Sequence, residues 1–156
     1  MQLTYHTDYA LRLLMYLALK PDRLTTVEEV STAFGVSRNH MMKVAHGLGR
    51  AGYVETVRGR SGGLRLKRET GSIRIGAVVR DMEEGWQIVE CFDLARNTCV
   101  IAGPCRLKGV LKEALGAYLA VLDRYTLADL MANPTQIGRR LGVGGASGAK
   151  ATAPPA

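Results

Sequence analysis

The feature that most limits the fold of this chain is the order of its local patterns: a helix, a glycine turn, a second helix and then a hairpin. Overlapping capping boxes at residues 25–29 begin a short helix, and Gly35 supplies the turn. Ser37 can cap a second helix over 38–51. Residues 53–68 then alternate as two strands around a glycine-rich turn. This order predicts a winged helix-turn-helix, so the expected fold class is mainly α with a small β wing.

In such a fold the N-terminal turn of the second helix faces base edges in the major groove of DNA. Here that turn and the wing carry the expected DNA-binding residues, which are Ser37, Arg38, Asn39, His40, Lys43, Arg58, Arg60 and Arg65. Arg38 and Asn39 are of the types that read guanine and adenine through two hydrogen bonds. Arg60 lies between glycines and is the best candidate to enter a minor groove. A solvated polar surface would explain any one of these residues, but their convergence with a basic wing favours a DNA interface.

The charge of the chain is consistent with this prediction. Its formal net charge is +7, and eight Lys or Arg residues fall between Arg50 and Arg80. A basic balance favours nucleic acid or an acidic membrane surface as partner, although solubility alone could account for the total. The longest apolar stretch, residues 9–19, contains Arg12 and is shorter than the ~20 residues of a membrane span. We therefore expect no membrane segment, no signal peptide and a cytoplasmic location.

All three cysteines of the chain, Cys91, Cys99 and Cys105, lie within fifteen residues of an irregular, polar stretch. Thiolates are soft metal ligands, and an odd number of clustered cysteines argues against a disulfide scaffold. A four-ligand site leaves one position open. The candidates for it are Asp8, His6, His40, His46, Glu90 and Asp93. From the residues alone, an iron–sulfur cluster, a zinc site and a thiol switch all remain open.

The rest of the chain is predicted to be helical. An apolar helix over 9–19 should be buried, with Thr7 as its cap and Asp8 at the positive end of the helix dipole. A helix from Arg106 carries an apolar stripe, which suits either a dimer seam or packing on its own domain. The expected divisions are a winged helix-turn-helix domain (1–75), a short helix and cysteine loop (76–105), a dimerisation helix and short C-terminal helix (106–141), and a disordered tail (142–156).

Three segments together resemble the bacterial iron–sulfur winged-helix regulators: LTYHTDYALRLLMYLAL, TTVEEVSTAFGVSRNHMMKVAHGLGRAGYVETVRGRSGGLRL and CFDLARNTCVIAGPCRL. The resemblance covers about residues 1 to 135. It implies a homodimer that binds double-stranded operator DNA as a repressor. It also implies a 4Fe–4S or 2Fe–2S cluster, of which 4Fe–4S is preferred here.

By the same resemblance, Cys91, Cys99 and Cys105 would be cluster ligands, with Asp8 supplied by the other subunit. Arg12, one turn after Asp8, would couple the cluster to the helix-turn-helix. The implied signal is nitric oxide: the intact cluster permits operator binding, and nitrosylation ends it. On residues alone, the helix dipole is the favoured explanation of Asp8.

A redox or cluster-supply sensor of the same family and a zinc-stabilised winged-helix regulator are the nearest alternatives. An electron-transfer protein would have no need of a basic helix-turn-helix. An enzyme is the least favoured, because a cysteine nucleophile needs a positioned base. The only histidines fall in the opening and in the helix-turn-helix, so no catalytic residue is expected.

Overall fold

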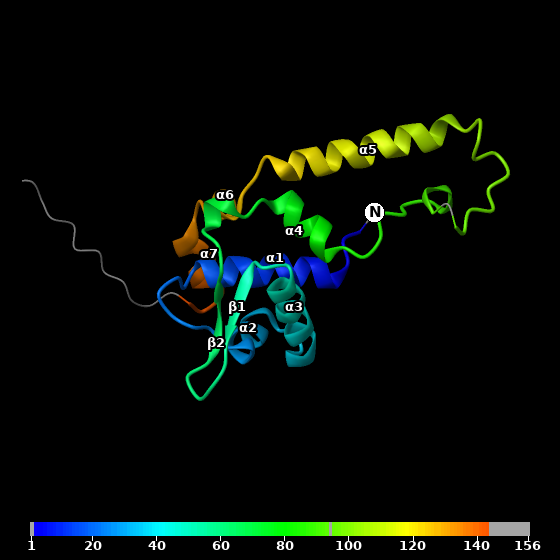
Figure 1. Cartoon of the computed structure of the whole chain (residues 1–156). Coiled ribbons are helices and arrows are strands. Elements are labelled where there is room, and N and C mark those ends of the chain that lie inside the picture. The colour runs from blue at the N-terminus through cyan, green and yellow to red at the C-terminus, as the bar shows by residue number, and fades with distance from the viewer. Residues whose placement is uncertain (1, 94, 144–156) are drawn as a thin grey trace, which may run out of the picture.

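The computed structural model describes residues 2–93 and 95–143. Helix α1 (Tyr5–Ala18) runs through the centre, with α2 (Val27–Phe34) and α3 (Arg38–Arg50) on one side of it. Strands β1 (Val54–Val57) and β2 (Gly63–Leu66) form a hairpin beside α3. On the other side of α1 lie α4 (Ile75–Met82) and then the long α5 (Arg106–Asp123) (Figure 1). Short helices α6 (Leu127–Leu130) and α7 (Pro134–Arg140) follow α5, and the described elements confirm a mainly α fold with a small β wing.

The helix-turn-helix forms where its caps predict. Thr26 Oγ1 accepts a hydrogen bond of 3.1 Å from the Glu29 amide, and Ser37 Oγ accepts one of 3.3 Å from the His40 amide. Gly35 ends α2 with a φ of 64°, a left-handed conformation that glycine adopts without steric cost. The predicted second helix is therefore confirmed, with its N-terminal turn fixed by Ser37.

The wing is an antiparallel pair in which Val54 faces Leu66 and Glu55 faces Arg65. It is fastened to the start of the helix-turn-helix by two backbone hydrogen bonds between Thr25 and Leu64, of 3.0 and 2.8 Å. A Cβ at Gly63 would lie 2.9 Å from the Thr25 carbonyl oxygen, so a residue without a side chain is needed at this approach. The wing is thus a fixed extension of the domain at its base.

Helix α1 begins four residues earlier than predicted. Thr4, not Thr7, occupies the N-cap, and its Oγ1 accepts a 3.3 Å hydrogen bond from the Thr7 amide. Thr7 is fully buried and donates its hydroxyl to the carboxylate of Glu83. The prediction failed because Glu83, a residue distant in sequence, completes the cap. Asp8 consequently lies inside the first turn of the helix.

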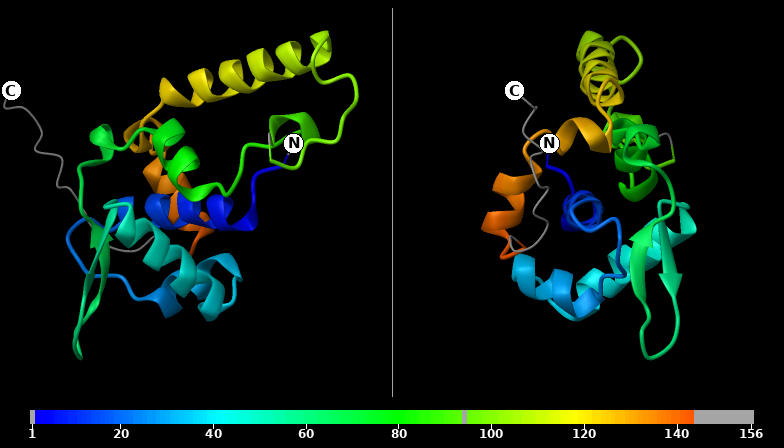
Figure 2. Two further views of the ribbon diagram at one scale, coloured as in Figure 1. Left: turned by 45° about the vertical axis from the view of Figure 1, so that its right-hand side comes forward. Right: turned by 90° about the vertical axis from the view of Figure 1, so that its left-hand side faces the viewer.

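The other helices and the hairpin are arranged around α1, as the end-on view in Figure 2 shows, and the hydrophobic core lies between them and this helix. Leu13, Leu14 and Leu17 are each 2% exposed or less. They belong to one cluster with Val30, Met41, Val44, Leu48, Val54, Leu64, Ile73, Val78, Val79 and Leu127. The prediction that the first helix is buried is confirmed, and α2, α3, β1, β2, α4 and α6 each contribute to this cluster.

Helix α5 is different, because none of its side chains is fully buried. It extends beyond the body of the molecule and carries the cysteine loop at its far end (Figures 1 and 2). Helix α7 was not predicted, although Asn133-Pro134 places a proline at its first position. The tail predicted to be disordered lies, from residue 144 on, outside the described residues. Within the described ranges, no helix is both long and apolar enough to cross a membrane.

Candidate DNA interface and cysteine loop

The predicted DNA-reading side chains lie together on the first turns of α3. Arg38, Asn39, His40 and Lys43 are all exposed. Arg38 Nε lies 3.4 Å from Glu28 Oε2, with both side chains more than 60% exposed. An ion pair this exposed contributes little in water, so Arg38 can exchange Glu28 for another anion at small cost. The geometry is therefore open to base or phosphate contact at the position where a recognition helix needs it.

The three wing arginines differ in what they contact. Arg65 is committed to Glu55 on the facing strand, at 2.9 Å, and this hydrogen bond lowers the pKa of the Glu55 carboxyl. Arg58 and Arg60 are exposed at the tip, where Gly59 has a φ of 115°. Neither of them pairs with a carboxylate in the part of the chain that the structure describes. Arg58 and Arg60 are thus the wing cations available to a polyanion.

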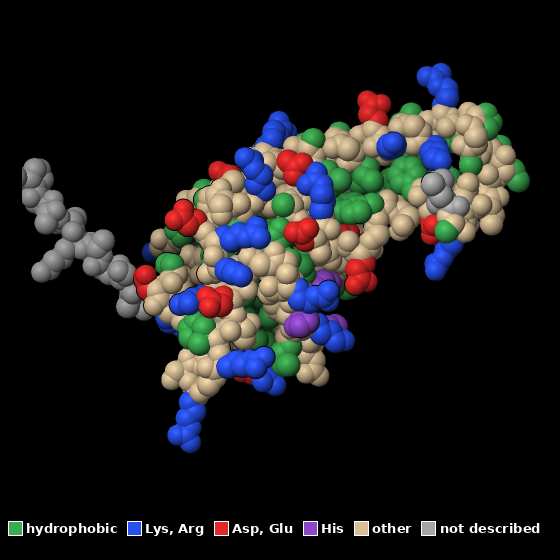
Figure 3. Space-filling model, viewed as in Figure 1, with side chains coloured by type: hydrophobic (Ala, Val, Ile, Leu, Met, Phe, Trp, Pro, Cys, Tyr) green, Lys and Arg blue, Asp and Glu red, His purple; other side chains and the backbone are tan. Residues whose placement is uncertain are grey.

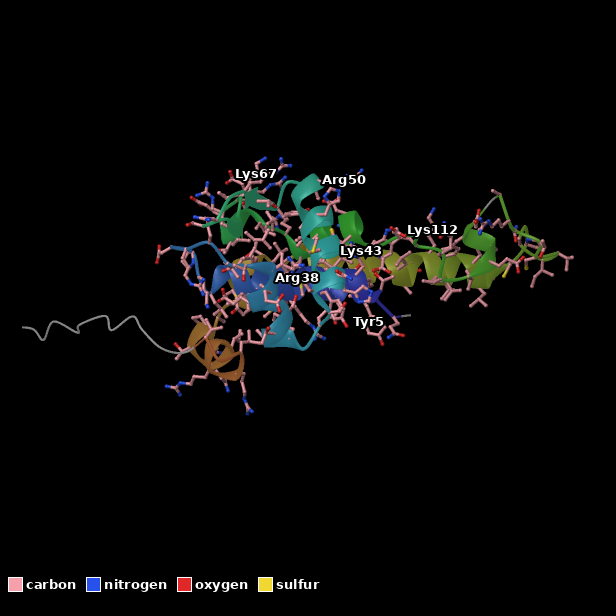
Figure 4. The ribbon with its side chains drawn as sticks, turned by 90° about the horizontal axis from the view of Figure 1, so that it is seen from below. Tyr5, Arg38, Lys43, Arg50, Lys67 and Lys112 are labelled. Atoms are coloured by element: carbon pink, nitrogen blue, oxygen red, sulfur yellow. The ribbon has the colours of Figure 1, made fainter. Side chains whose placement is uncertain are left out.

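Two further basic residues, which the sequence interpretation missed, lie on the same face. Figure 4 shows Arg38, Lys43 and Arg50 of α3 with Lys67, just after β2, on the underside of the molecule. Arg50 and Lys67 both line an open groove of about 410 Å³ between α3 and the wing. The signal was present, because Arg50 lies seven residues, or two turns, after Lys43. In Figure 3, Lys and Arg side chains surround this region and reach the tip of the wing.

The cysteines are free thiols, and all three are partly buried. Cys91 lies in a 3-10 turn over Glu90–Phe92, and Cys105 is the N-cap residue of α5. The Glu90 carboxylate accepts hydrogen bonds from the amide and hydroxyl of Thr98, at 2.6 and 2.7 Å. These bonds lower the pKa of the Glu90 carboxyl and bring Thr98, the residue before Cys99, next to Glu90, the residue before Cys91.

Three free, partly buried thiols are the donor chemistry of an iron–sulfur cluster. Their positions in a single chain do not yet form a site: among residues 2–93 and 95–143, no three His, Cys, Asp or Glu side chains lie close enough to hold one metal ion. The donor set therefore fits the predicted cofactor chemically. Convergence on one centre would require the loop to close further and, for four ligands, a donor from elsewhere.

Asp8, the predicted fourth ligand, is held by Arg12 of its own helix. Arg12 Nη2 lies 2.6 Å from Asp8 Oδ2, and Arg12 Nε donates to Asp8 Oδ1 at 3.1 Å. The predicted coupling residue therefore contacts the predicted ligand through both oxygens. Both oxygens of the Asp8 carboxylate thus bind a residue one turn further along α1, while the side chain stays 37% exposed.

Glu83 joins the start of the cysteine loop to the start of α1. It is the C-cap residue of α4, and its carboxylate accepts hydrogen bonds from the Thr4 amide at 3.2 Å and the Thr4 hydroxyl at 3.0 Å, as well as from Thr7. Asp8 follows Thr7 directly in this turn. Glu83 thus joins the base of the loop to the turn that carries Asp8. No local pattern could reveal this contact, because Glu83 is 79 residues from Thr4.

Next to Glu83, the loop leaves the body over a pocket of about 330 Å³ that Leu3, Trp86, Ile88 and Tyr118 help to line. Burial and the nearby Glu83 charge raise the pKa of Tyr118. Trp86 is the only tryptophan of the chain. Its fluorescence therefore reports on the junction between α4, α5 and the cysteine loop.

Comparison with known proteins gives the family. Residues 3–133 match Rrf2, described as an iron-dependent transcriptional regulator, and this range includes both the helix-turn-helix and the cysteine loop. The chain belongs to the Rrf2 family. As a member of that family it is a winged-helix transcriptional regulator and not an enzyme, as the sequence predicted.

Several Rrf2 relatives are about half identical to it in sequence. The HTH-type transcriptional regulator NsrR of Halalkalibacterium halodurans is 52% identical over 138 residues, covering 88% of this chain and 94% of the relative. NsrR of Bacillus subtilis gives the same identity and coverage. Among solved structures, T. potens IscR has a TM-score of 0.69 at 23% identity, covering 87% of this chain and 90% of that one. Oxidized Staphylococcus aureus CymR also has a TM-score of 0.69, at 22% identity and with 85% and 97% covered. These structures support the Rrf2 fold.

Proposed function

We propose that this Rrf2 regulator is a homodimeric repressor that binds operator DNA in an iron–sulfur-dependent way and responds to nitric oxide. The observation that carries the proposal is the Glu83 contact, which ties the base of a three-thiol loop to the first turn of the helix beneath the recognition helix. A change in the cysteine loop when the cluster loses a ligand would thereby reach the DNA-binding surface of α3. The family's description as iron-dependent supports a metal at that loop.

Cys91, Cys99 and Cys105 would hold the cluster, with 4Fe–4S as the first choice and 2Fe–2S as the alternative. When bound, the cluster supplies a redox-active centre that reacts with nitric oxide. A carboxylate is a hard ligand for such a soft site and would be readily displaced, which suits a sensor. We assign that role to Asp8 of a second copy of the chain.

In this proposal the Asp8 carboxylate has two competing partners. Within its own chain it pairs with Arg12 through both oxygens. As a ligand in trans it would give up at least part of this pair, and Arg12 would be freed. The switch therefore consists of an exchange between a salt bridge along α1 and a bond to another subunit. Coupling of ~1–3 kcal/mol would change DNA affinity about 5–150-fold.

The dimer would form along α5. Its apolar stripe includes Leu107, Val110 and Val121, whose exposures of 61%, 58% and 43% are high for aliphatic residues. A second copy would cover this stripe and place two recognition helices about one DNA turn, ~34 Å, apart. A small displacement of α1 would then misalign one of the two half-sites.

The proposal is tested on protein purified without oxygen. The expected protein is brown, contains iron and sulfide, and loses affinity for a selected operator duplex as nitric oxide is added. Cys99→Ala should remove both the visible absorption and the specific DNA binding. A colourless protein with stoichiometric zinc would establish the zinc-stabilised alternative. Loss of colour without loss of DNA binding would show that the cluster does not control the operator.

A further inference from the structure

The imidazole of His40, on the first turn of the recognition helix, packs against a residue of α1. The ring centroids of Tyr9 and His40 are 6.4 Å apart, with an angle of 47° between the planes. This separation lies within the range at which aromatic rings attract each other. His40 is otherwise exposed. The orientation of His40, which is expected to contact bases, is therefore influenced by Tyr9, a residue outside α3.

Tyr9 is itself held by neighbours along α1. The ring of Tyr5 stacks on it at 5.9 Å with an interplanar angle of 28°, and the Arg12 guanidinium lies 5.6 Å from its centroid. Arg12 also lies 6.0 Å from the ring of Phe34, the last residue of α2. The guanidinium thus contacts both rings, with Asp8 fixing its direction. Tyr9 is consequently a well-positioned support for His40.

We propose that Tyr9 is a positioning residue for DNA recognition, whose ring orients the His40 imidazole and so sets the base preference at the position that His40 reads. The inference rests on the proposed contact of His40 with operator DNA. An exposed imidazole samples several rotamers, and a ring packed against it reduces that freedom before DNA arrives. Tyr9 acts through His40 and makes no contact with a base itself.

The test is a double-mutant cycle on the anaerobically purified full chain. The probe is a labelled duplex that the wild-type protein selects from a randomised library, with a shuffled duplex of the same composition as reference. Tyr9→Leu should weaken binding to the selected duplex about 2–10-fold, the range that an aromatic pair provides. It should leave binding to the shuffled duplex unchanged. In a His40→Ala background, Tyr9→Leu should have almost no further effect, because its target is absent.

Base preference distinguishes a positioning role from a purely structural one, because a loss of stability alone would not change it. Substituting each base pair of the selected duplex in turn should show that Tyr9→Leu and His40→Ala lose discrimination at the same position. The salt slope should stay constant for Tyr9→Leu, since no phosphate contact is removed. Tyr9→Phe keeps the ring and should behave as wild type. Tyr5→Leu, which leaves the Tyr9–His40 pair in place, is the matched control and should have a smaller effect.

Additive effects in the cycle, or a preference lost at different positions, would overturn the inference. So would a His40→Ala protein that discriminates every base pair as the wild type does. Should Tyr9→Leu fail to fold, Tyr9→Met removes the ring but supplies a flexible, unbranched apolar side chain that adapts to the space left, and the same outcomes apply. A wild-type protein that does not prefer the selected duplex to the shuffled one would instead contradict the proposed function, so the two failures are distinguishable.

Discussion

Arg80 of α4 holds Asp123 of α5 through two parallel hydrogen bonds of 2.6 Å each. The Asp123 backbone carbonyl also accepts a 2.9 Å hydrogen bond from Arg74 Nη1. Gly76 packs directly against the Asp123 side chain, where a Cβ would collide with the carboxylate. The last turn of α5 is therefore fixed to α4, while its first turn carries the cysteine loop away from the body (Figure 1).

Replacing Asp123 by Asn should loosen α5 without unfolding the winged-helix domain. Arg80 lowers the pKa of Asp123, so the carboxylate is charged at neutral pH and the substitution removes a charge from the pair. Both side chains are 40% exposed, so the effect on global stability should be small and the local effect larger. Amide hydrogen exchange should become faster in α5 and in few other places. Asp22→Asn, an exposed carboxylate outside the described ion pairs, is the control. Equal exchange in α5 for both variants would contradict the prediction.

Arg60→Ala should weaken DNA binding and reduce the salt dependence of the affinity. An arginine that neutralises one phosphate releases about one counterion, so the slope of log K against log salt should fall by about one. Arg124→Ala makes the same charge change at the end of α5, on the side of α1 away from the helix-turn-helix, and should leave the slope unaltered. Fluorescence anisotropy over a series of salt concentrations measures both. An unchanged slope for Arg60→Ala would exclude the wing contact.

Asp8→Ala should preserve the visible colour of the anaerobic protein and alter its titration with nitric oxide. Three thiolates remain to hold the cluster, but the displaceable ligand is lost and Arg12 has no carboxylate partner in α1. Stopped-flow absorption together with Trp86 fluorescence would follow the centre and the adjoining loop at once. Asp22→Ala serves as the control for loss of an acidic residue. An identical titration for Asp8→Ala and wild type would leave Asp8 as a residue of the helix dipole only.

Glu29 should make stability depend on pH below neutrality. Burial alone would raise its pKa, but hydrogen bonds from Arg23, Lys20 and Tyr16 outweigh burial and lower the pKa to about 2. A carboxyl whose pKa is lower in the folded state stabilises the fold above its unfolded pKa of ~4.3, and that contribution is lost as the pH falls toward 2.

The comparison that tests this is urea unfolding of wild type and Glu29→Gln. The variant should be about 2 kcal/mol less stable at pH 7, allowing for partial exposure of the site. The difference should shrink steadily between pH 4.5 and 2, because the wild-type carboxyl becomes protonated there. A difference that stays constant across this interval would show that the three hydrogen bonds do not act through the charge. Glu28→Gln, at an exposed neighbouring position, is the matched control.

The parts of the fold specified by local signals were predictable. Ser37 and Gly35 mark the second helix and its turn, and the alternation around Gly59 marks the wing. The start of α1 was not predictable, since its cap is completed by Glu83 from another element. Lys67 could not be placed from the sequence, because only the folded hairpin brings it beside α3, whereas the helical spacing of Arg50 from Lys43 was a local signal that the prediction overlooked. The distances between the three cysteines likewise depend on the tertiary structure, so their spacing in the sequence could not predict them.

The cysteine loop is anchored on both sides: Glu83 binds the first turn of α1 where the loop begins, and Arg80 binds Asp123 at the far end of the helix that follows it. The loop between these two contacts can therefore change in length without moving the helix-turn-helix. Lengthening a loop of about twenty residues by two costs only ~0.1 kcal/mol in closure entropy. If the proposed cluster is present, residues could therefore be inserted between its cysteines at little cost to the fold, because both contacts that fasten the loop lie outside the inserted stretch.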